Sequence, residues 1–315
     1  MRALHFDGSA VRVAELPEPE PRAGDAIVRV RLAGLCKTDL EIARGYLGFR
    51  GVLGHEFVGQ VAAGPAEWLG RRVVGEISFA CRRCETCARG LARHCPARSV
   101  MGISGADGAF AELVRVPVAN LHAVPDALAD EAAVFCEPLA AAFEILEQVE
   151  VSRGTRCLVL GDGKLGLLVA QVLAGAGARV TAVGRHPEKL AILRARGIET
   201  ARLEEWRVER APLVVDATGS ARGFELAVAA TLPRGTLVLK STVAERPALD
   251  LAPLVIDEIS VVGSRCGPFP PALRALASGG VDVRPLVAER MALDRGAEAF
   301  ERAARPGALK VLLEA

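Results

Sequence analysis

Side chains that bind zinc gather in the N-terminal part of the chain. Cys36, Thr38 and Asp39 lie in one short segment, and His55 and Glu56 follow directly after a glycine. Zinc binds sulfur, nitrogen and oxygen ligands, and a catalytic zinc keeps three protein ligands plus an open position for water or substrate. Alone, Cys36 would more often be a small buried residue and His55 an ordinary core histidine. Together these residues predict part of a catalytic zinc site, which needs a further ligand from elsewhere in the chain.

The best candidate for that further ligand is Glu137. It lies in Phe135-Cys136-Glu137-Pro138-Leu139, where Cys136 is the competing donor. Two anionic ligands, Cys36 and Glu137, with a neutral His55 would cancel the charge of the metal, which would still act as a Lewis acid. Asp39 is expected to accept a hydrogen bond from His55 and so to fix its tautomer. Thr38 is expected to take the proton of an alcohol substrate.

Four cysteines form the most specific pattern in the chain. Their order is Cys81-x-x-Cys84-x-x-Cys87, with Cys95 after a longer gap. Four thiolates brought together by short turns make a closed tetrahedral zinc site, which holds a loop in place of a hydrophobic core. An iron–sulfur cluster is the rival, but the gap before Cys95 is longer than in ferredoxin runs. We expect a structural zinc ion here, with four buried or redox-active cysteines as the remaining alternative.

A glycine-rich segment predicts a nucleotide site. Gly161-Asp162-Gly163-Lys164-Leu165-Gly166 follows the apolar run Cys157–Leu160 and opens a helical pattern from Leu167 to Ala174. A strand before the motif and a helix after it are the context that dinucleotide binding requires. The glycines allow a tight turn and a close approach of the backbone to a pyrophosphate, whose charge is favoured at a helix N-terminus. A glycine-rich turn without a ligand is the alternative.

The segment after the next strand bears on which dinucleotide binds. NAD-dependent proteins usually carry an acidic residue there, which binds the ribose 2′-hydroxyl. In this chain the strand Val180–Val183 ends in Gly184-Arg185-His186 instead. A missing carboxylate removes repulsion, and a guanidinium forms bidentate bonds to a phosphate. We therefore predict NADP in preference to NAD, with His186 as an additional contact; the alternative is an Arg185 that stacks on adenine or lies in solvent.

The spacing of apolar residues indicates two kinds of structure. Residues 1 to about 30 alternate apolar and polar positions, and short apolar runs near 57–62, 72–74 and 111–116 are separated by glycine turns, so the first part is predicted to be a small β-rich barrel or sandwich. From Cys157 onward, apolar strands alternate with amphipathic helices, which is typical of an α/β fold with a parallel sheet covered on both faces. We expect its six strands at Cys157–Leu160, Val180–Val183, Glu199–Ala201, Leu213–Asp216, Thr236–Leu239 and Ile259–Gly263. A final strand is expected at Leu309–Leu313.

Five motifs occur in the order found in one known family. They are Cys36-x-Thr38-Asp39, Gly54-His55-Glu56, the Cys81 to Cys95 cluster, Glu137-Pro138-Leu139 and Gly161-x-Gly163-x-x-Gly166. In these motifs the chain resembles the zinc-dependent medium-chain dehydrogenase/reductase superfamily of alcohol, sorbitol, threonine and glucose dehydrogenases. The similarity spans nearly the whole chain.

The resemblance implies a chaperonin-like (GroES-like) barrel as the catalytic domain, with the C-terminal tail returning to it. We accordingly expect a discontinuous catalytic domain at 1–138 and 268–315 and a doubly wound Rossmann domain at 139–267. The resemblance also implies that Glu56 lies close to the metal as an alternate ligand. It places Lys37 and Lys310 near the cofactor pyrophosphate, although each would otherwise be read as an ordinary surface lysine.

Composition excludes several classes of protein. The 315 residues carry a net charge of +1 without a long basic run, so nucleic acid is not an expected partner. The longest apolar stretch, Leu165 to Ala178, is too short to span a bilayer, and the N-terminal residues lack the core of a signal peptide. A cytoplasmic protein is therefore expected, in which the eight cysteines are ligands and core residues rather than disulfides.

The favoured function is a zinc-dependent oxidoreductase with two zinc ions per chain that transfers hydride between NADP(H) and an alcohol, polyol, aldehyde or ketone. An NAD-dependent dehydrogenase of the threonine or sorbitol type is one alternative. A cofactor-binding sensor or structural protein is another, and a zinc-free reductase of the same superfamily is disfavoured by the retained ligands. Relatives form dimers and tetramers, so a homodimer or homotetramer is expected.

Overall fold

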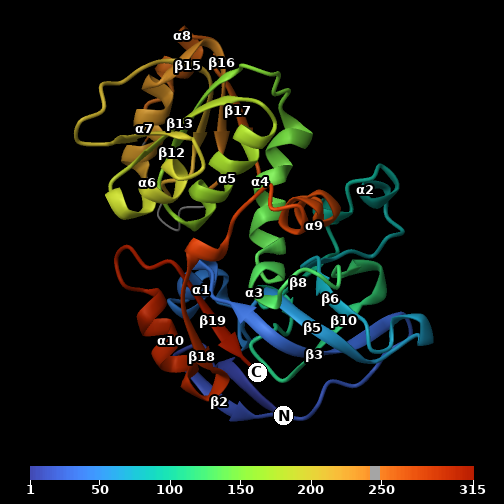
Figure 1. The fold of residues 1–315 in the computed structure, drawn as a ribbon. Helices are drawn as coiled ribbons and strands as arrows, with labels where there is room; N and C mark the ends of the chain where they lie inside the picture. Colours follow the sequence, from blue (N-terminus) through green and yellow to red (C-terminus); the bar gives the residue numbers. More distant parts are fainter. Residues whose placement is uncertain (242–248) are drawn as a thin grey trace. The chain divides into compact units, whose positions relative to one another are not determined.

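The computed structural model describes residues 1–241 and 249–315, which belong to two compact units (Figure 1). Unit 1 is built from both ends of the chain and consists of Met1–Glu137, Ala272–Ala277 and Leu286–Ala315. Unit 2 consists of Pro138–Pro271 and Ser278–Pro285. The segment Ser278–Pro285 thus groups with unit 2, although it lies within the range 268–315 expected for the first domain. Among the described residues, no helix has both the length and the apolar composition to cross a membrane.

Unit 2 contains a parallel sheet of six strands in the order β14-β13-β12-β15-β16-β17. This is the order of a doubly wound dinucleotide-binding fold, and the six strands expected from the sequence are confirmed. The strands are β12 (Arg156–Leu160), β13 (Arg179–Gly184), β14 (Glu199–Arg202), β15 (Ala211–Asp216), β16 (Thr231–Leu239) and β17 (Ser260–Gly263). Their apolar side chains are buried because helices cover the sheet, and Leu158, Val214 and Leu237 lie in its core.

Helices lie between most of the successive strands of unit 2, and α4 precedes the first of them, β12. Their bounds are α4 (Cys136–Gln148), α5 (Lys164–Gly175), α6 (Pro187–Arg194), α7 (Ala221–Ala229) and α8 (Ala252–Ile256). Helix α5 packs on β12 and β13, and α7 packs on β15 and β16. The strand order reverses between β12 and β15, and ligands of such sheets bind outside the carboxyl ends of the strands at this point.

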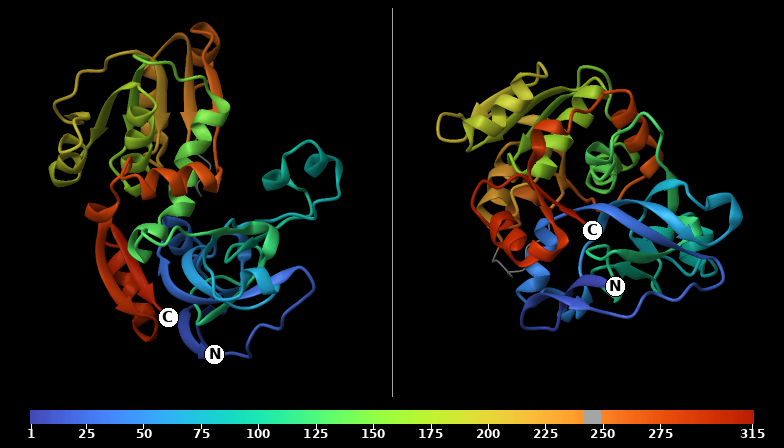
Figure 2. Two further views of the ribbon diagram at one scale, coloured as in Figure 1. Left: turned by 45° about the vertical axis from the view of Figure 1, so that its right-hand side comes forward. Right: turned by 60° about the horizontal axis from the view of Figure 1, so that its bottom comes forward.

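The main sheet of unit 1 joins the two ends of the chain. Its strands follow the order β11-β6-β5-β3-β19-β18, and β10 also pairs with β3. Their bounds are β3 (Asp25–Gly34), β5 (Glu56–Ala63), β6 (Arg72–Gly75), β10 (Leu113–Pro117), β11 (Leu121–Ala123), β18 (Val287–Ala292) and β19 (Lys310–Glu314). Strand β19 pairs antiparallel with β3, with Leu312 opposite Gly34. Figure 2 shows these C-terminal strands beside the N-terminal sheet, so the expected return of the tail to the first domain is confirmed.

Two small sheets and several short helices complete unit 1. The sheets are β2-β1-β4 and β7-β8-β9, formed by β1 (Arg2–Phe6), β2 (Val11–Glu15), β4 (Gly51–Val52), β7 (Ser78–Phe79), β8 (Ser99–Met101) and β9 (Gly105–Ala106). The helices are α1 (Lys37–Ala43), α2 (Glu85–Ala88), α3 (Asp130–Ala133) and α10 (Gly296–Ala303), and α9 (Phe269–Ala277) belongs to unit 1 from Ala272 onward. Phe110 and Phe300 meet edge to face with ring centroids 6.1 Å apart, which anchors α10 in the core.

Candidate zinc and dinucleotide sites

Two adjacent strands bring the predicted zinc ligands together. Cys36 follows the end of β3 and precedes α1, whereas His55 and Glu56 lie at the start of β5. Because β3 and β5 pair with Gly34 opposite Glu56, the two segments meet at one end of the sheet. The turn before His55 needs a glycine, since Gly54 has a φ of +96° and a Cβ there would collide with the ring of Phe110.

The side chains of Cys36, His55 and Glu56 converge on one point. Their ligand atoms all lie within 4.8 Å of one another. Asp39 Oδ1 lies 3.1 Å from His55 Nδ1, so the expected hydrogen bond is present and Nε2 is left for a metal. Asp39 Oδ2 also accepts a hydrogen bond of 2.8 Å from the backbone N–H of Cys36. One carboxylate therefore fixes both the imidazole and the backbone that carries the thiol.

The electrostatics of this cluster favour a bound cation. Asp39, His55 and Glu56 are buried, and Glu56 Oε1 has no hydrogen-bond partner among the described residues. Burial alone would lower the pKa of His55, but the charges of Asp39 and Cys36 hold that pKa well above its ordinary value. The donor set of one sulfur, one nitrogen and one oxygen matches the ligands of a catalytic zinc. Thr38 Oγ1 lies 3.7 Å from Cys36 Sγ, close to this point.

Lys310 is part of the same buried cluster. Its ammonium group forms an ion pair with Glu56 Oε2 and lies 5.6 Å from the centroid of the Phe135 ring. Burial lowers the pKa of Lys310, but the charges of Glu56, Cys36 and Asp39 outweigh that effect and raise it. Lys310 is thus not an ordinary surface lysine, and its contact with a pyrophosphate stays a prediction. Lys37, the other lysine predicted there, is exposed at the start of α1.

The structure places the predicted third ligand outside this group. Glu137 lies in the first turn of α4 and is not a member of the cluster formed by Cys36, His55 and Glu56. Its role as a zinc ligand remains a prediction. Cys136, the competing donor, is buried, and burial raises the pKa of its thiol well above the usual value. Because zinc binds the thiolate form, this favours Glu137 over Cys136.

The four-cysteine segment forms a compact sulfur cluster around α2. Cys84 Sγ lies 3.5 Å from Cys87 Sγ and 3.8 Å from Cys95 Sγ, and Cys95 Sγ lies 3.5 Å from Cys81 Sγ. Tetrahedral zinc with Zn–S bonds of about 2.3 Å would separate its sulfurs by about 3.8 Å, whereas a disulfide requires about 2 Å. Backbone N–H groups of Arg83 and Cys84 lower the pKa of Cys81 to about 6, whereas burial raises that of Cys87 to about 12, so the sulfur geometry and not the pKa values carries the assignment. The residues present fit a closed zinc site.

The glycine-rich turn of unit 2 has the form that a dinucleotide requires. Gly161 has a φ of +110°, and a Cβ there would lie 2.8 Å from the backbone of Ala217. A Cβ on Gly166 would collide with the carbonyl oxygen of Gly161, whereas the space beside Gly163 is open. Backbone from the turn can therefore approach a pyrophosphate closely at the start of α5, where Lys164 and Leu165 are the first residues.

The carboxyl end of β13 contains a contact that the sequence did not reveal. Gly184 is buried and Arg185 is exposed. The carboxylate of Asp162, from the glycine-rich turn, accepts hydrogen bonds from the backbone N–H groups of Arg185 and His186 and lies 3.0 Å from His186 Nδ1. In the sequence, the acidic residue inside the glycine-rich motif was the one feature that could have indicated these hydrogen bonds.

Lys240 has a structural role at the end of β16. Its ammonium group is buried and donates to Ala141 O at 2.6 Å, Ser264 Oγ at 3.1 Å and Arg265 O at 2.9 Å. These three acceptors lie on α4 and on the segment after β17. Lys240 therefore ties a helix to the end of the sheet.

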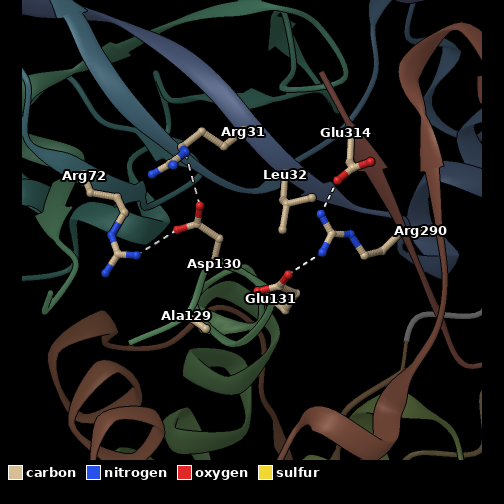
Figure 3. Close-up of a pocket in the computed structure, with 8 residues that line it drawn as sticks. All are labelled: Arg31, Leu32, Arg72, Ala129, Asp130, Glu131, Arg290 and Glu314. Carbon is tan, nitrogen blue, oxygen red and sulfur yellow. Dashed lines mark hydrogen bonds and ion pairs between the residues drawn. The ribbon is translucent and has the colours of Figure 1, made fainter. Parts of the chain in front are cut away.

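A pocket of about 430 Å³ on unit 1 is lined by charges that already pair with one another (Figure 3). Asp130 forms ion pairs with Arg72 at 3.0 Å and with Arg31 at 3.2 Å. Arg290 forms ion pairs with both Glu131 and Glu314. Three arginines and three carboxylates line the pocket, so its charges cancel one another. It contains none of the predicted site residues.

Both parts of the chain match known protein families. Residues 22–126 match the alcohol dehydrogenase GroES-like domain, and residues 165–278 match the zinc-binding dehydrogenase family. The chain is 31% identical to D-altritol 5-dehydrogenase of Agrobacterium fabrum over 99% of this chain and 98% of that protein. A zinc-binding dehydrogenase of Sinorhizobium meliloti in complex with NADP superposes with a TM-score of 0.91 at 26% identity, covering 100% of this chain and 99% of that one. The alcohol dehydrogenase RspB of Escherichia coli in complex with NADH superposes with a TM-score of 0.92 at 26% identity, covering 100% of this chain and 99% of that one.

The chain belongs to the zinc-dependent medium-chain dehydrogenase/reductase superfamily. It is an alcohol-dehydrogenase-like oxidoreductase of the zinc-binding type. The family resemblance in the sequence is thereby confirmed.

Proposed function

We propose that this protein transfers hydride between NADP(H) and a small alcohol or polyol at a zinc ion held by Cys36 and His55. The observation that carries the proposal is the convergence of Cys36, His55 and Glu56, together with a buried oxygen of Glu56, Oε1, that lacks a hydrogen-bond partner among the described residues. The names of relatives, which include D-altritol 5-dehydrogenase and sorbitol dehydrogenase, support a polyol as the substrate class.

The residues of the chain have distinct roles in this proposal. When bound, zinc supplies a Lewis acid that lowers the pKa of an alcohol, and the nicotinamide accepts the hydride. Asp39 holds the imidazole of His55 in the tautomer that presents Nε2. Thr38 would relay the proton of the substrate: its hydroxyl oxygen takes up that proton while its own O–H proton passes on to water. Glu137 completes the ligand set, and Glu56 serves as an alternate ligand whose charge is balanced by Lys310.

We further propose two zinc ions per chain. The second is held by Cys81, Cys84, Cys87 and Cys95, whose sulfur separations of 3.5 to 3.8 Å are close to the edge of a zinc–thiolate tetrahedron. This site has no open position, so its role is to hold the loop.

The cofactor preference can be measured directly. With Arg185 exposed and no carboxylate at position 184, we expect kcat/KM for NADP to exceed that for NAD by about tenfold or more, since a bidentate guanidinium–phosphate contact contributes on the order of 1.5–3 kcal/mol. The measurement is initial rates with both cofactors across a panel of alcohols, polyols and aldehydes. A preference for NAD would contradict the assignment of Arg185, and binding of NADPH without turnover on the whole panel would favour a sensor.

We also propose that two chains associate through strand β17, the last strand of the parallel sheet. This edge strand exposes Val261, and the preceding helix α8 exposes Val255 and Ile256, each 77% accessible. An edge strand beside exposed apolar side chains favours association. Light scattering should give a dimer or a larger even assembly, and Val261→Lys with Ile256→Glu should shift it to monomer. A monomeric wild-type protein would contradict this interface.

A further inference from the structure

The carboxylate that sequence analysis found missing after β13 is present in space, because Asp162 supplies it from the glycine-rich turn. Asp162 Oδ2 accepts the backbone N–H of Arg185 at 2.7 Å and that of His186 at 2.6 Å. His186 Nδ1 lies 3.1 Å from Oδ1 and 3.0 Å from Oδ2. Four polar contacts therefore join the first turn of the nucleotide site to the segment after the second strand.

The side chain of Asp162 explains why position 184 is a glycine. A Cβ on Gly184 would lie 2.5 Å from Asp162 Cβ and 2.5 Å from Asp162 Oδ2. Real Cβ atoms do not approach other atoms so closely. The side chain of Asp162 thus fills the space that an acidic residue at the end of β13 would need, and the two arrangements exclude each other.

The carboxylate of Asp162 is buried and already has hydrogen-bond donors from the protein. Two successive backbone N–H groups together with an imidazole surround it. Burial would raise the pKa of Asp162, but hydrogen bonds from His186 and Arg185 lower it below the ordinary value. The carboxylate is therefore ionised at neutral pH, and its donors are those that would otherwise bind an anion. Arg185, by contrast, extends into solvent.

We propose that Asp162 is a positioning residue for cofactor choice: it clamps the backbone of Arg185 and His186 so that the Arg185 guanidinium is presented to the 2′-phosphate of NADP. This inference rests on the proposed NADP preference. The rival arrangement is an Asp162 that faces the ribose itself and accepts a bond from the 2′-hydroxyl of NAD. In that case its charge would repel a phosphate.

Two substitutions of Asp162 distinguish the effect of its hydrogen bonds to the backbone from the effect of its negative charge. Asp162→Ala removes every hydrogen bond of this side chain. Asp162→Asn keeps an oxygen that can accept both backbone N–H groups, but it loses the charge and turns the second oxygen, beside His186 Nδ1, into an amide donor. Calorimetry with NADPH, NADH and adenosine 2′,5′-bisphosphate reports binding without turnover. Asp257→Asn is the matched control, because Asp257 lies in the same unit and pairs with Arg210 at 3.1 Å instead.

We expect Asp162→Ala to weaken binding of NADPH and of adenosine 2′,5′-bisphosphate by about tenfold, since the charge-assisted hydrogen bonds that hold the backbone of Arg185 and His186 are lost and solvent replaces only part of them. NADH affinity should change by less than about threefold, which also shows that the site is still folded. Asp162→Asn should stay within about threefold of the wild type for all three ligands, and Asp257→Asn should match it.

Three outcomes would overturn the inference, and they are distinguishable. Unchanged NADPH binding in Asp162→Ala, with a wild type that prefers NADPH, would refute the clamp alone. Tighter NADPH binding in Asp162→Asn would show that the carboxylate repels the phosphate. A wild type that binds NADH more tightly than NADPH would overturn the cofactor preference and the clamp together.

Discussion

Replacing Cys36 with serine is expected to lower kcat/KM for alcohol oxidation by about 10³-fold or more. Lewis-acid activation of the alcohol contributes several kcal/mol, and each 1.36 kcal/mol corresponds to about a factor of ten in rate. Cys36 is the one sulfur ligand in the cluster with His55 and Glu56, and serine replaces the thiolate with a hydroxyl that binds zinc weakly. The purified variant should contain one zinc ion fewer per chain and should bind NADPH as the wild type does.

Cys136→Ser is the matched control for this substitution. Cys136 is a buried thiol next to the predicted ligand Glu137, and its raised pKa argues against a thiolate. The control should therefore keep both zinc ions and most of the activity, measured on folded protein. If Cys136→Ser loses a zinc ion and Cys36→Ser keeps it, the ligand assignment is incorrect.

Among the substitutions considered, replacing Cys95 with serine is expected to lower the thermal stability of the protein most. Cys95 is the buried member of the sulfur cluster, and its Sγ lies 3.5 Å from Cys81 Sγ and 3.8 Å from Cys84 Sγ. Binding of a structural zinc ion stabilises small domains by on the order of 10 kcal/mol. In this protein the loss should be smaller, because the hydrophobic core of unit 1 remains when the zinc ion is removed. We expect Tm to fall by about 10 °C, because a loss of a few kcal/mol shifts the midpoint by about 2–4 °C per kcal/mol in a domain of this size.

A neighbouring residue of the same loop tests whether this loss is specific. His94 directly precedes Cys95 but is not part of the sulfur cluster, so His94→Ala should retain the zinc and the wild-type Tm. Calorimetric scans with metal analysis of both variants provide the comparison. Loss of one zinc ion from Cys95→Ser without a change in Tm would show that the site is not structural.

The regular parts of the fold could be predicted because they follow a strict period. The strands of the parallel sheet are continuous apolar runs, and the observed β12 and β15 extend the predicted ranges by only one or two residues. Strands of two residues, such as β4 and β7, carry no periodic signal and were not predicted. The apolar residues between 128 and 135 are spaced as in a helix, but in the structure α3 covers only Asp130–Ala133.

The site was predictable only where its residues lie in short motifs. Cys36, His55 and the cysteine loop are local patterns, so their chemistry could be inferred from type and spacing. The ion pair between Glu56 and Lys310 joins residues 254 positions apart, and its partners can be identified only once β19 pairs with β3. Asp162 and Lys240 were missed as structural residues for the same reason, since hydrogen bonds made by folding have no signal in a single sequence.

The most direct test of the zinc-based account is a chelator titration of the wild-type enzyme, with the alcohol oxidation rate measured against zinc per chain. The site at Cys36 and His55 keeps an open position and should exchange first, whereas the four-cysteine site is closed. The account predicts that the rate falls in proportion to the first zinc ion lost, reaches zero at one zinc per chain, and returns when zinc is added back. A full rate at one zinc per chain or below would contradict it.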